Sequence, residues 1–138
     1  MFWKSKRAAA SPPEASSTTR RATGDHGETR ALAHLQRHGL TLVERNYRVA
    51  RGRSRHAGEI DLVLSERDGT LVFVEVRVRS TRDGGGAAAS VTHGKRSRLV
   101  YAAQHYLQRF DRLPPCRFDV VAIDGEDLQW LRGAFDAG

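Results

Sequence analysis

The chain has 138 residues, which is enough for one domain of ordinary size and too few for two. Apolar residues make up 39% of the chain and the formal net charge is +7, a composition that favours a folded globular protein over a disordered one. No apolar run approaches the ~20 residues of a membrane span, and the first residues lack the apolar centre of a secretory signal, so we expect a cytoplasmic protein. The single cysteine, Cys116, excludes an intrachain disulfide and a cysteine-based zinc site.

The positive charge is concentrated near the beginning of the chain. Residues 1–23 have a net charge of +4, whereas the other residues together have +3. This first segment is rich in Ser, Pro, Ala and Thr and has no periodic apolar face, so we expect a disordered basic arm, followed by one domain at 24–138. We interpret the arm as a solubilising extension, and a dedicated nucleic-acid-binding arm is the alternative.

After the arm, the pattern predicts a helix and then three strands. Apolar residues at helical spacing indicate a helix over about 25–38, and β-branched and aromatic residues indicate a strand over 40–49. The next segment is predicted as a loop rich in arginine (Arg48, Arg51, Arg53 and Arg55). Residues 58–79 then predict a β-hairpin, because two strand-like runs flank a turn that ends in Gly69.

The second half of the chain predicts one more helix and one or two strands. A glycine-rich connector at 83–90 precedes the helix, whose apolar stripe is typical of packing on a sheet (Leu99, Ala103, Tyr106, Leu107 and Phe110). A strand is expected over 117–123 and a short edge strand over 128–131. The order α-β-β-β-α-β predicts an α/β domain with a mixed central sheet flanked by helices.

The turn of the predicted hairpin fixes its register. With Gly69 in the left-handed conformation, Glu66 pairs with Thr70, and the numbers of opposite residues sum to 136. One face of the hairpin is then a continuous apolar layer for the core (Ile60, Leu62, Leu64, Val72, Val74, Val76 and Val78).

The same register places charged residues opposite each other on the second face. Asp61 lies opposite Glu75, and Glu59 lies opposite Arg77. Opposed carboxylates repel each other, and this face also contains apolar residues that suggest a cover by the helix at 25–38. If it is covered, the acidic pair needs a counter-charge, either a divalent cation or the nearby arginines.

Glu28 is a candidate third acid. It lies three residues before Ala31 on the packed stripe of the helix and therefore projects toward the sheet. The alternative is a capping box, because Asp25 and Glu28 have the spacing in which the second residue reaches back to a backbone N–H group. Three converging acids would make an oxygen-ligand site of the magnesium type, with Mn²⁺ as the related ion.

Several segments of the chain resemble one bacterial family. They are GEIDLVLSERDGTLVFVEVRVRS (58–80), GGAAASVTHGKRSRL (85–99), PCRFDVVAI (115–123) and WLRGAF (130–135). They are similar to the YraN-like family of uncharacterised bacterial proteins, which is described as a family of endonucleases in the PD-(D/E)XK superfamily, distantly similar to archaeal Holliday-junction resolvases. The resemblance covers roughly residues 24–135 and implies a restriction-endonuclease-like core.

The resemblance also implies roles for individual residues. Asp61 and Glu75 would hold the metal, Glu28 would support it, and the backbone carbonyl of Val76 would complete the protein ligands. The lysine of the superfamily would fall at position 77, where this chain has Arg77. A guanidinium is always charged, so Arg77 would act as a donor and electrostatic clamp on the phosphate, or it would serve only as the cross-strand partner of an acid.

Two groups of cations are candidates for nucleic-acid binding. Lys95 is the only lysine outside the arm, and with Arg96 and Arg98 it lies near the start of the second helix. Cations there oppose the helix dipole unless an anion is present, so we expect them to contact phosphates. The alternative is a solvated polar face. We expect Arg51, Arg53 and Arg55 to join the same nucleic-acid surface.

These features predict a magnesium-dependent endonuclease that hydrolyses phosphodiester bonds in DNA of branched or irregular structure. The alternative is a non-catalytic nucleic-acid-binding or partner-docking module that has kept the fold, as an arginine at position 77 would allow. A resolvase-like role would favour a two-fold homodimer, because a four-way junction presents two sites to cut.

Overall fold

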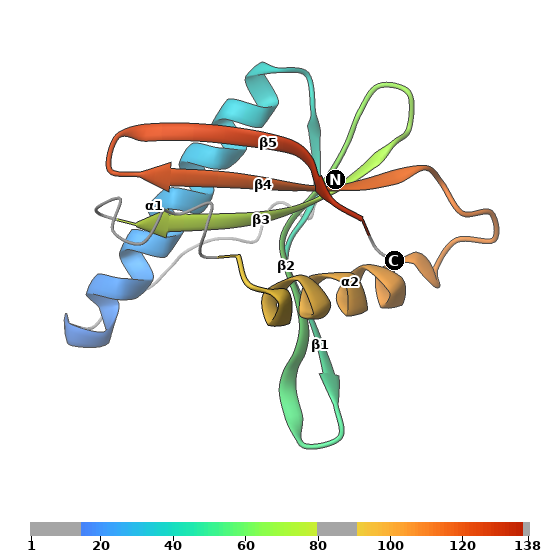
Figure 1. Cartoon of the computed structure of the whole chain (residues 1–138), viewed down its shortest axis with the longest axis horizontal. Helices are drawn as coiled ribbons and strands as arrows, with labels where there is room; N and C mark the ends of the chain where they lie inside the picture. Colours follow the sequence, from blue (N-terminus) through green and yellow to red (C-terminus); the bar gives the residue numbers. More distant parts are fainter. Residues whose placement is uncertain (1–14, 80–90, 137–138) are drawn as a thin grey trace.

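The computed structural model describes residues 15–79 and 91–136 as a mixed sheet with helices packed on it (Figure 1). Its elements are α1 (Ala15–Arg37), β1 (Thr41–Arg51), β2 (Ser54–Ser65), β3 (Leu71–Arg79), α2 (His93–Leu107), β4 (Cys116–Asp124) and β5 (Asp127–Phe135). The strand order is β1-β2-β3-β4-β5, with β3 and β4 parallel and the other neighbours antiparallel. This confirms the predicted α/β class and is consistent with a restriction-endonuclease-like core. Neither described helix has the length and apolar character that crossing a membrane requires.

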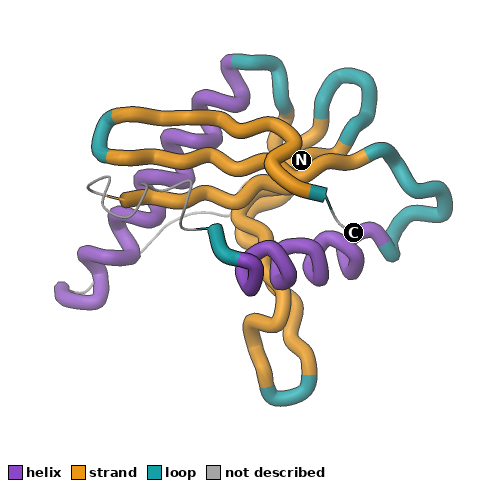
Figure 2. The backbone as a smooth tube through the Cα atoms, viewed as in Figure 1, coloured by secondary structure: helices purple, strands orange, loops and turns teal. Residues whose placement is uncertain are grey.

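The two helices cover opposite faces of the sheet (Figure 2). Ala31 and Leu35 of α1 pack against the apolar layer of the hairpin, which includes Leu62 and Val74. The second face was predicted to lie under the first helix, and that prediction is wrong. Its residues Val63 and Phe73 pack against α2, whose buried positions are Leu99, Ala102, Ala103 and Tyr106. Alternate side chains of a strand point to opposite faces, so each helix covers one set.

The first helix begins earlier than predicted. It starts at Ala15 rather than near residue 25, so residues 15–23 of the predicted arm are helical. Ala and Arg are good helix formers, and no proline follows Pro13 in this segment to stop the helix. Asp25 and Glu28 therefore lie in the helix interior, which rules out the capping-box interpretation of Glu28. Residues 1–14 of the arm and the connector at 83–90 lie outside the described residues.

The arginine-rich segment after β1 is part of a hairpin, not the predicted loop. Arg51 of β1 lies opposite Ser54 of β2, and Gly52 between them has a φ of 60°. This left-handed backbone suits a tight hairpin turn and is readily adopted by glycine. The far end of the β1–β2 hairpin projects past α2 in Figure 1.

At two positions, a glycine allows a helix to approach a strand closely. A Cβ atom at Gly58 of β2 would lie 2.9 Å from the backbone nitrogen of Ala102 in α2. A Cβ atom at Gly27 of α1 would lie 2.3 Å from a methyl carbon of Val78 in β3. Both helices can therefore pack directly on the sheet only because these side chains are absent.

The last strand is longer than predicted. β5 spans Asp127–Phe135 instead of 128–131, and a register shift between Phe118 and Val120 accommodates it on β4. Phe135 lies opposite Phe118, and the two rings stack with centroids 5.2 Å apart. Phe135 thereby packs against the α2 side of the core.

Candidate functional site

The candidate site lies where β2 separates from β3. The predicted register is confirmed from Ser65 opposite Leu71 to Leu62 opposite Val74. In an antiparallel ladder every second pair of residues exchanges both backbone hydrogen bonds. The next N–H group of β3, that of Val76, would therefore donate to the carbonyl oxygen of Ile60. Instead, the Val76 N–H group donates to Oδ2 of Asp61 at 2.8 Å. A side-chain carboxylate thus replaces the backbone acceptor at the point where the strands part.

This hydrogen bond also orients the carbonyl group of Val76. The N–H and C=O groups of one strand residue point to the same neighbouring strand. Because the Val76 N–H group faces Asp61, its carbonyl oxygen is directed to the same opening between β2 and β3. Asp61 and the Val76 carbonyl, which were both predicted as metal ligands, therefore both face this opening, one from β2 and the other from β3.

The predicted pairing of Glu59 with Arg77 is not formed in the ladder. Glu59 lies opposite Arg48 of β1, and Arg48 Nε donates to Glu59 Oε2 at 3.3 Å. Arg77 instead forms an ion pair with Glu75, with 3.4 Å between Nη1 and Oε2. The reason is that the pairing of β2 with β3 ends at Leu62 and Val74. Glu59, which precedes Leu62 in β2, is therefore paired only with β1.

Asp61 carries a carboxyl group whose ionised form is disfavoured. Burial raises the pKa of Asp61 well above its ordinary value of 3.8, and the nearby Glu75 carboxylate raises the pKa further. The hydrogen bond from Val76 lowers it, while Glu28 and Glu59 add smaller repulsions. Three other carboxylates, those of Glu75, Glu28 and Glu59, therefore act on Asp61.

Burial and two nearby cations shift the pKa of Glu75 in opposite directions. Burial raises the pKa of Glu75, and the Arg77 guanidinium and the Lys95 ammonium both lower it. The side chain of Glu75 is 14% exposed and that of Arg77 is 25% exposed. Lys95 comes from the first turn of α2, so this helix brings one of the predicted phosphate-binding cations to the acidic pair.

Glu28 reaches the site from the other face of the sheet. It lies in α1, and its carboxylate forms an ion pair with Arg45 of β1 at 3.4 Å. The Glu28 side chain is 15% exposed, and its charge contributes to the raised pKa of Asp61. The Glu28 carboxylate is therefore close enough to affect Asp61, and the Arg45 guanidinium partly neutralises its charge.

The donor atoms at the opening fit a hard divalent cation. Within the described ranges, no three His, Cys, Asp or Glu side chains are placed to hold a metal ion by themselves. Mg²⁺ commonly takes only one or two carboxylates from a protein and completes its shell with water and phosphate oxygens. Asp61 and Glu75 supply two carboxylates with raised pKa values, and a cation would relieve their repulsion.

The predicted nucleic-acid-binding residues divide between the hairpin and α2. The Arg51 guanidinium lies 5.7 Å from the centre of the Tyr101 ring, which joins the tip of the hairpin to α2. Arg53, Arg96 and Arg98 are exposed, and Lys95 is half-buried. The side chain of Arg55 lies outside the described part of the structure. The contact of Arg51 with Tyr101 thus connects the tip of the hairpin to α2.

A buried carboxylate in β4 was missed by the sequence analysis. Asp119 is 0% exposed, and its oxygens accept hydrogen bonds from Arg117 Nε, Trp130 Nε1 and the Gly133 N–H group at 2.9–3.2 Å. Arg117 also pairs with Glu66 at the β2–β3 turn. The available signal was a pair of charged residues, two positions apart, in an otherwise apolar strand. This network joins β4 to β5 and has a structural role.

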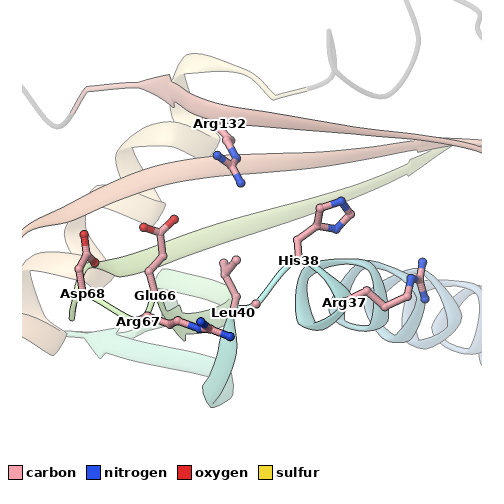
Figure 3. A pocket seen from close by; sticks show the side chains of 8 residues that line it. Arg37, His38, Leu40, Glu66, Arg67, Asp68 and Arg132 are labelled. Atoms are coloured by element: carbon pink, nitrogen blue, oxygen red, sulfur yellow. The ribbon is translucent and has the colours of Figure 1, made fainter.

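A separate pocket of about 550 Å³ lies at the end of α1 (Figure 3). Arg37 and His38 line it from the helix end, Arg67 from the β2–β3 turn, and Arg132 from β5. In Figure 3 the Arg132 side chain points from its strand toward Glu66 across the pocket. None of the predicted metal ligands lines this pocket, so the acidic opening is a different place in the fold.

The fold defines an α/β protein with a mixed five-stranded sheet and two helices, an arrangement consistent with a restriction-endonuclease-like core. The chain belongs to the uncharacterised protein family UPF0102, whose family model matches residues 27–123. This confirms the family resemblance of the sequence, because the YraN-like proteins are this family. The matched residues include the acidic opening and the first turn of α2.

Relatives extend the similarity over most of the chain. A UPF0102 protein of Methylibium petroleiphilum is 67% identical over 119 residues, which is 86% of this chain and 98% of the relative. A UPF0102 protein of Acidovorax sp. is 62% identical over 86% of this chain and 88% of its own length. One from Paracidovorax citrulli is 55% identical over 96% of each chain.

Proposed function

We propose that this protein is a metal-dependent endonuclease that hydrolyses phosphodiester bonds in DNA, including branched DNA. The observation that carries the proposal is the Asp61–Glu75 pair at the opening between β2 and β3. Burial and mutual repulsion raise the pKa of Asp61, so the site holds negative charge that a divalent cation would compensate. A structural role alone would be served at lower cost by neutral side chains.

The protein ligands proposed for Mg²⁺ or Mn²⁺ are Asp61, Glu75 and the carbonyl oxygen of Val76. Glu28 supports them through its charge and its contact with Arg45. When bound, the ion supplies Lewis-acid polarisation of the phosphoryl oxygen and lowers the pKa of its water. The hydrogen bond from Val76 holds one Asp61 oxygen in place and leaves the other free to turn toward the opening.

Arg77 and Lys95 are proposed to neutralise the charge that develops on the phosphate. Both cations lower the pKa of Glu75, and they come from different elements, Arg77 from β3 and Lys95 from α2. Arg77 remains protonated at any pH of interest and acts as a donor. Lys95 offers a rotatable ammonium from the helix, in the absence of a lysine at position 77.

The polyanion itself is proposed to lie along the hairpin and α2. Arg51, Arg53 and Arg55 on the hairpin and Lys95, Arg96 and Arg98 on the helix would contact phosphates next to the acidic opening. α2 has no acidic residue in its first turn, although its dipole favours one there. Phosphate groups would supply the missing negative charge.

The test is a cleavage assay with the full chain on duplex, four-way branched and single-stranded DNA, with Mg²⁺ or with EDTA. Asp61→Asn, purified in the same way, is the control for a contaminating nuclease. We expect cleavage that needs the ion and is lost in the variant, because Asn keeps an acceptor for Val76 but removes the charge. Cleavage that is equal in both proteins, or absent from the wild type on all three substrates, contradicts the proposal.

A second candidate is a nucleic-acid-binding module without turnover. The observation that favours it is the ion pair between Arg77 and Glu75, in which an arginine neutralises an acid of the proposed metal site. This candidate predicts DNA binding that is unaffected by Mg²⁺ and by Asp61→Asn. The same assay, combined with a binding measurement, distinguishes the two candidates.

A further inference from the structure

A second hollow runs along the outer side of α2, next to the end of β5. Its volume is about 440 Å³, and it is lined by His93, Arg96, Ser97, Tyr101 and Gln104 of α2 and by Phe135 of β5, among others. The lining positions from His93 to Gln104 extend over about 16 Å of helix. This groove combines aromatic rings, hydrogen-bonding side chains and a cation, a composition suited to nucleobases.

The groove contains a stack of planar groups that begins in the core. Phe118 is buried and its ring stacks on the ring of Phe135, with 14° between the planes. The Arg96 guanidinium lies over the Phe135 ring, 5.2 Å from its centre. Because Arg96 is exposed, the stack ends at the surface in a flat cationic group. A guanidinium plane held in this way is a platform on which an unpaired base can stack.

The groove and the proposed active site both use residues of the first turn of α2. Lys95 acts on Glu75, while its neighbours His93 and Arg96 line the groove. Toward the hairpin, Tyr101 lines the groove and also contacts Arg51. A strand whose phosphate lies at the acidic opening would therefore pass onto α2, where cations face its phosphates and the stack faces its bases.

We infer that the groove between α2 and the end of β5 binds the bases of an unpaired DNA strand, with one base stacked on Arg96. The inference rests on the proposed function for its link to cleavage, and it names the substrate class as DNA with a single-stranded segment. In duplex DNA the faces of each base are covered by neighbouring bases. The phosphates of a duplex can therefore contact the cations, but its bases cannot stack on Arg96. Asp136 also lines the groove, and its carboxylate would accept hydrogen bonds from N–H donors of the bases.

The test compares Arg96→Lys with Arg67→Lys, a change at the exposed β2–β3 turn outside the proposed DNA-binding surface. Lysine keeps the charge of arginine but lacks its planar group, and both residues are exposed, so neither change should affect folding. Binding of the full chain to a fluorescein-labelled dT 20-mer and to a 20-base-pair duplex is measured by anisotropy in EDTA, where a metal-dependent enzyme does not cleave. Phe135→Leu, which keeps apolar packing on Phe118, is a second variant that removes the support of the stack.

We expect Arg96→Lys to weaken binding of the dT 20-mer about threefold to tenfold and to change duplex binding less than about twofold. Arg67→Lys should change both by less than about twofold. Phe135→Leu should act like Arg96→Lys. The inference is overturned if Arg96→Lys weakens both ligands equally, if Arg67→Lys has the same effect, or if the wild type does not bind the dT 20-mer.

The outcome is separable from that of the proposed function. Selective loss of dT binding in Arg96→Lys, with no cleavage by the wild type, supports the groove and contradicts the nuclease. Mg²⁺-dependent cleavage of duplex DNA, with no effect of Arg96→Lys on dT binding, supports the nuclease and overturns the groove.

Discussion

The Val76 N–H group donates to Oδ2 of Asp61 at 2.8 Å, at the position where the next backbone bond of the β2–β3 ladder would form. The bond lets β2 turn away from β3 without leaving a buried donor unsatisfied. It also fixes Asp61 beside Glu75, where burial and repulsion disfavour two negative charges. The same contact thus opens the sheet and creates the acidic site.

Asp61→Asn should make the metal-free protein more stable at neutral pH. Asn retains an oxygen that accepts the Val76 N–H group, and the substitution removes a charge that burial and Glu75 disfavour. We expect a higher free energy of unfolding, because burial and Glu75 disfavour the Asp61 charge only in the folded chain. Chemical denaturation at pH 7 in EDTA measures it. A less stable variant would contradict a repulsive pair.

The same variant has a defined pH dependence. The pKa of Asp61 is raised in the folded chain, so between its unfolded value, near 3.8, and its folded value the folded chain binds more protons than the unfolded chain. Stability contributed by this group therefore falls as the pH rises through that window and is lowest above it. Asp61→Asn should flatten this fall. An unchanged pH profile would mean that Asp61 ionises without penalty.

Metal binding should stabilise the wild type but not Asp61→Asn. Mg²⁺ or Mn²⁺ stabilises the wild type if it binds only the folded chain, and the rise in Tm should grow with the concentration of the ion. Asp61→Asn should lose this rise, and Asp68→Asn, at the exposed β2–β3 turn, should keep it. Calorimetry with and without the ion measures the effect. Equal shifts in the wild type and Asp61→Asn would remove Asp61 from the proposed ligands.

The turn type predicted the register of the hairpin as far as Leu62 and Val74, where the ladder ends, so Asp61 and Glu75 are close to each other without being paired in it. Gly69 and the Glu66–Thr70 pair lead directly to the observed pairing of Leu62 with Val74. The register could not predict where the ladder ends, because that depends on a side chain taking the place of a backbone acceptor. The predicted contact of Glu59 with Arg77 fails for this reason. Local periodicity also gave no information on which helix covers which face, since either amphipathic helix fits either apolar face.

DNA binding should depend on the folded surface more than on the beginning of the chain. Because α1 begins at Ala15, a deletion of the whole predicted arm, residues 1–23, would shorten this helix. Deletion of residues 1–14 removes the segment ahead of the helix. With about 4–6 phosphate contacts, we expect a log–log salt slope of about −4 to −5 on duplex DNA, most of which the deletion should retain. Anisotropy titrations at several salt concentrations give the slope.

Two charge-removing sets of variants complete the test of that surface. Arg51→Gln with Arg53→Gln removes hairpin cations, and Arg37→Gln with Arg67→Gln removes two cations from the separate pocket near the end of α1. The first pair should reduce the salt slope by up to about 2, and the second pair should leave it nearly unchanged. A slope that collapses only on deletion of residues 1–14 would assign binding to the beginning of the chain.

Asp119→Asn should strongly destabilise the fold. The Asp119 carboxylate is fully buried and accepts from Arg117, Trp130 and the Gly133 backbone. An Asn amide would direct N–H groups at one of these donors and leave the Arg117 charge poorly compensated. We expect a loss of about 2–4 kcal/mol in the free energy of unfolding, measured by chemical denaturation. Asp68→Asn, at an exposed turn, should cost far less stability, and an equal loss in both variants would contradict the role given to the network.

Arg77 allows the sharpest separation of catalysis from structure. Its guanidinium pairs with Glu75 at 3.4 Å and is 25% exposed, so it lies beside the proposed metal ligands without being sealed from solvent. We expect Arg77→Lys to retain or raise the cleavage rate, because an ammonium can still neutralise the phosphate and restores the lysine of the resembling superfamily. Arg77→Ala should lower the rate, because Lys95 alone would then face the phosphate.

A purely structural role for Arg77 predicts a different order of effects. If Arg77 serves only to compensate Glu75, Arg77→Lys should change little, and Arg77→Ala should cost up to about 1 kcal/mol of stability without changing the rate per folded molecule. Removing the cation would also raise the pKa of Glu75, which Arg77 now lowers, so metal binding to Arg77→Ala should weaken as the pH falls. Cleavage rates and unfolding free energies of the wild type and both variants are compared with those of Arg67→Ala, a change at the exposed β2–β3 turn. An Arg77→Ala protein that is less stable but fully active would show that Arg77 positions Glu75 and takes no part in the reaction.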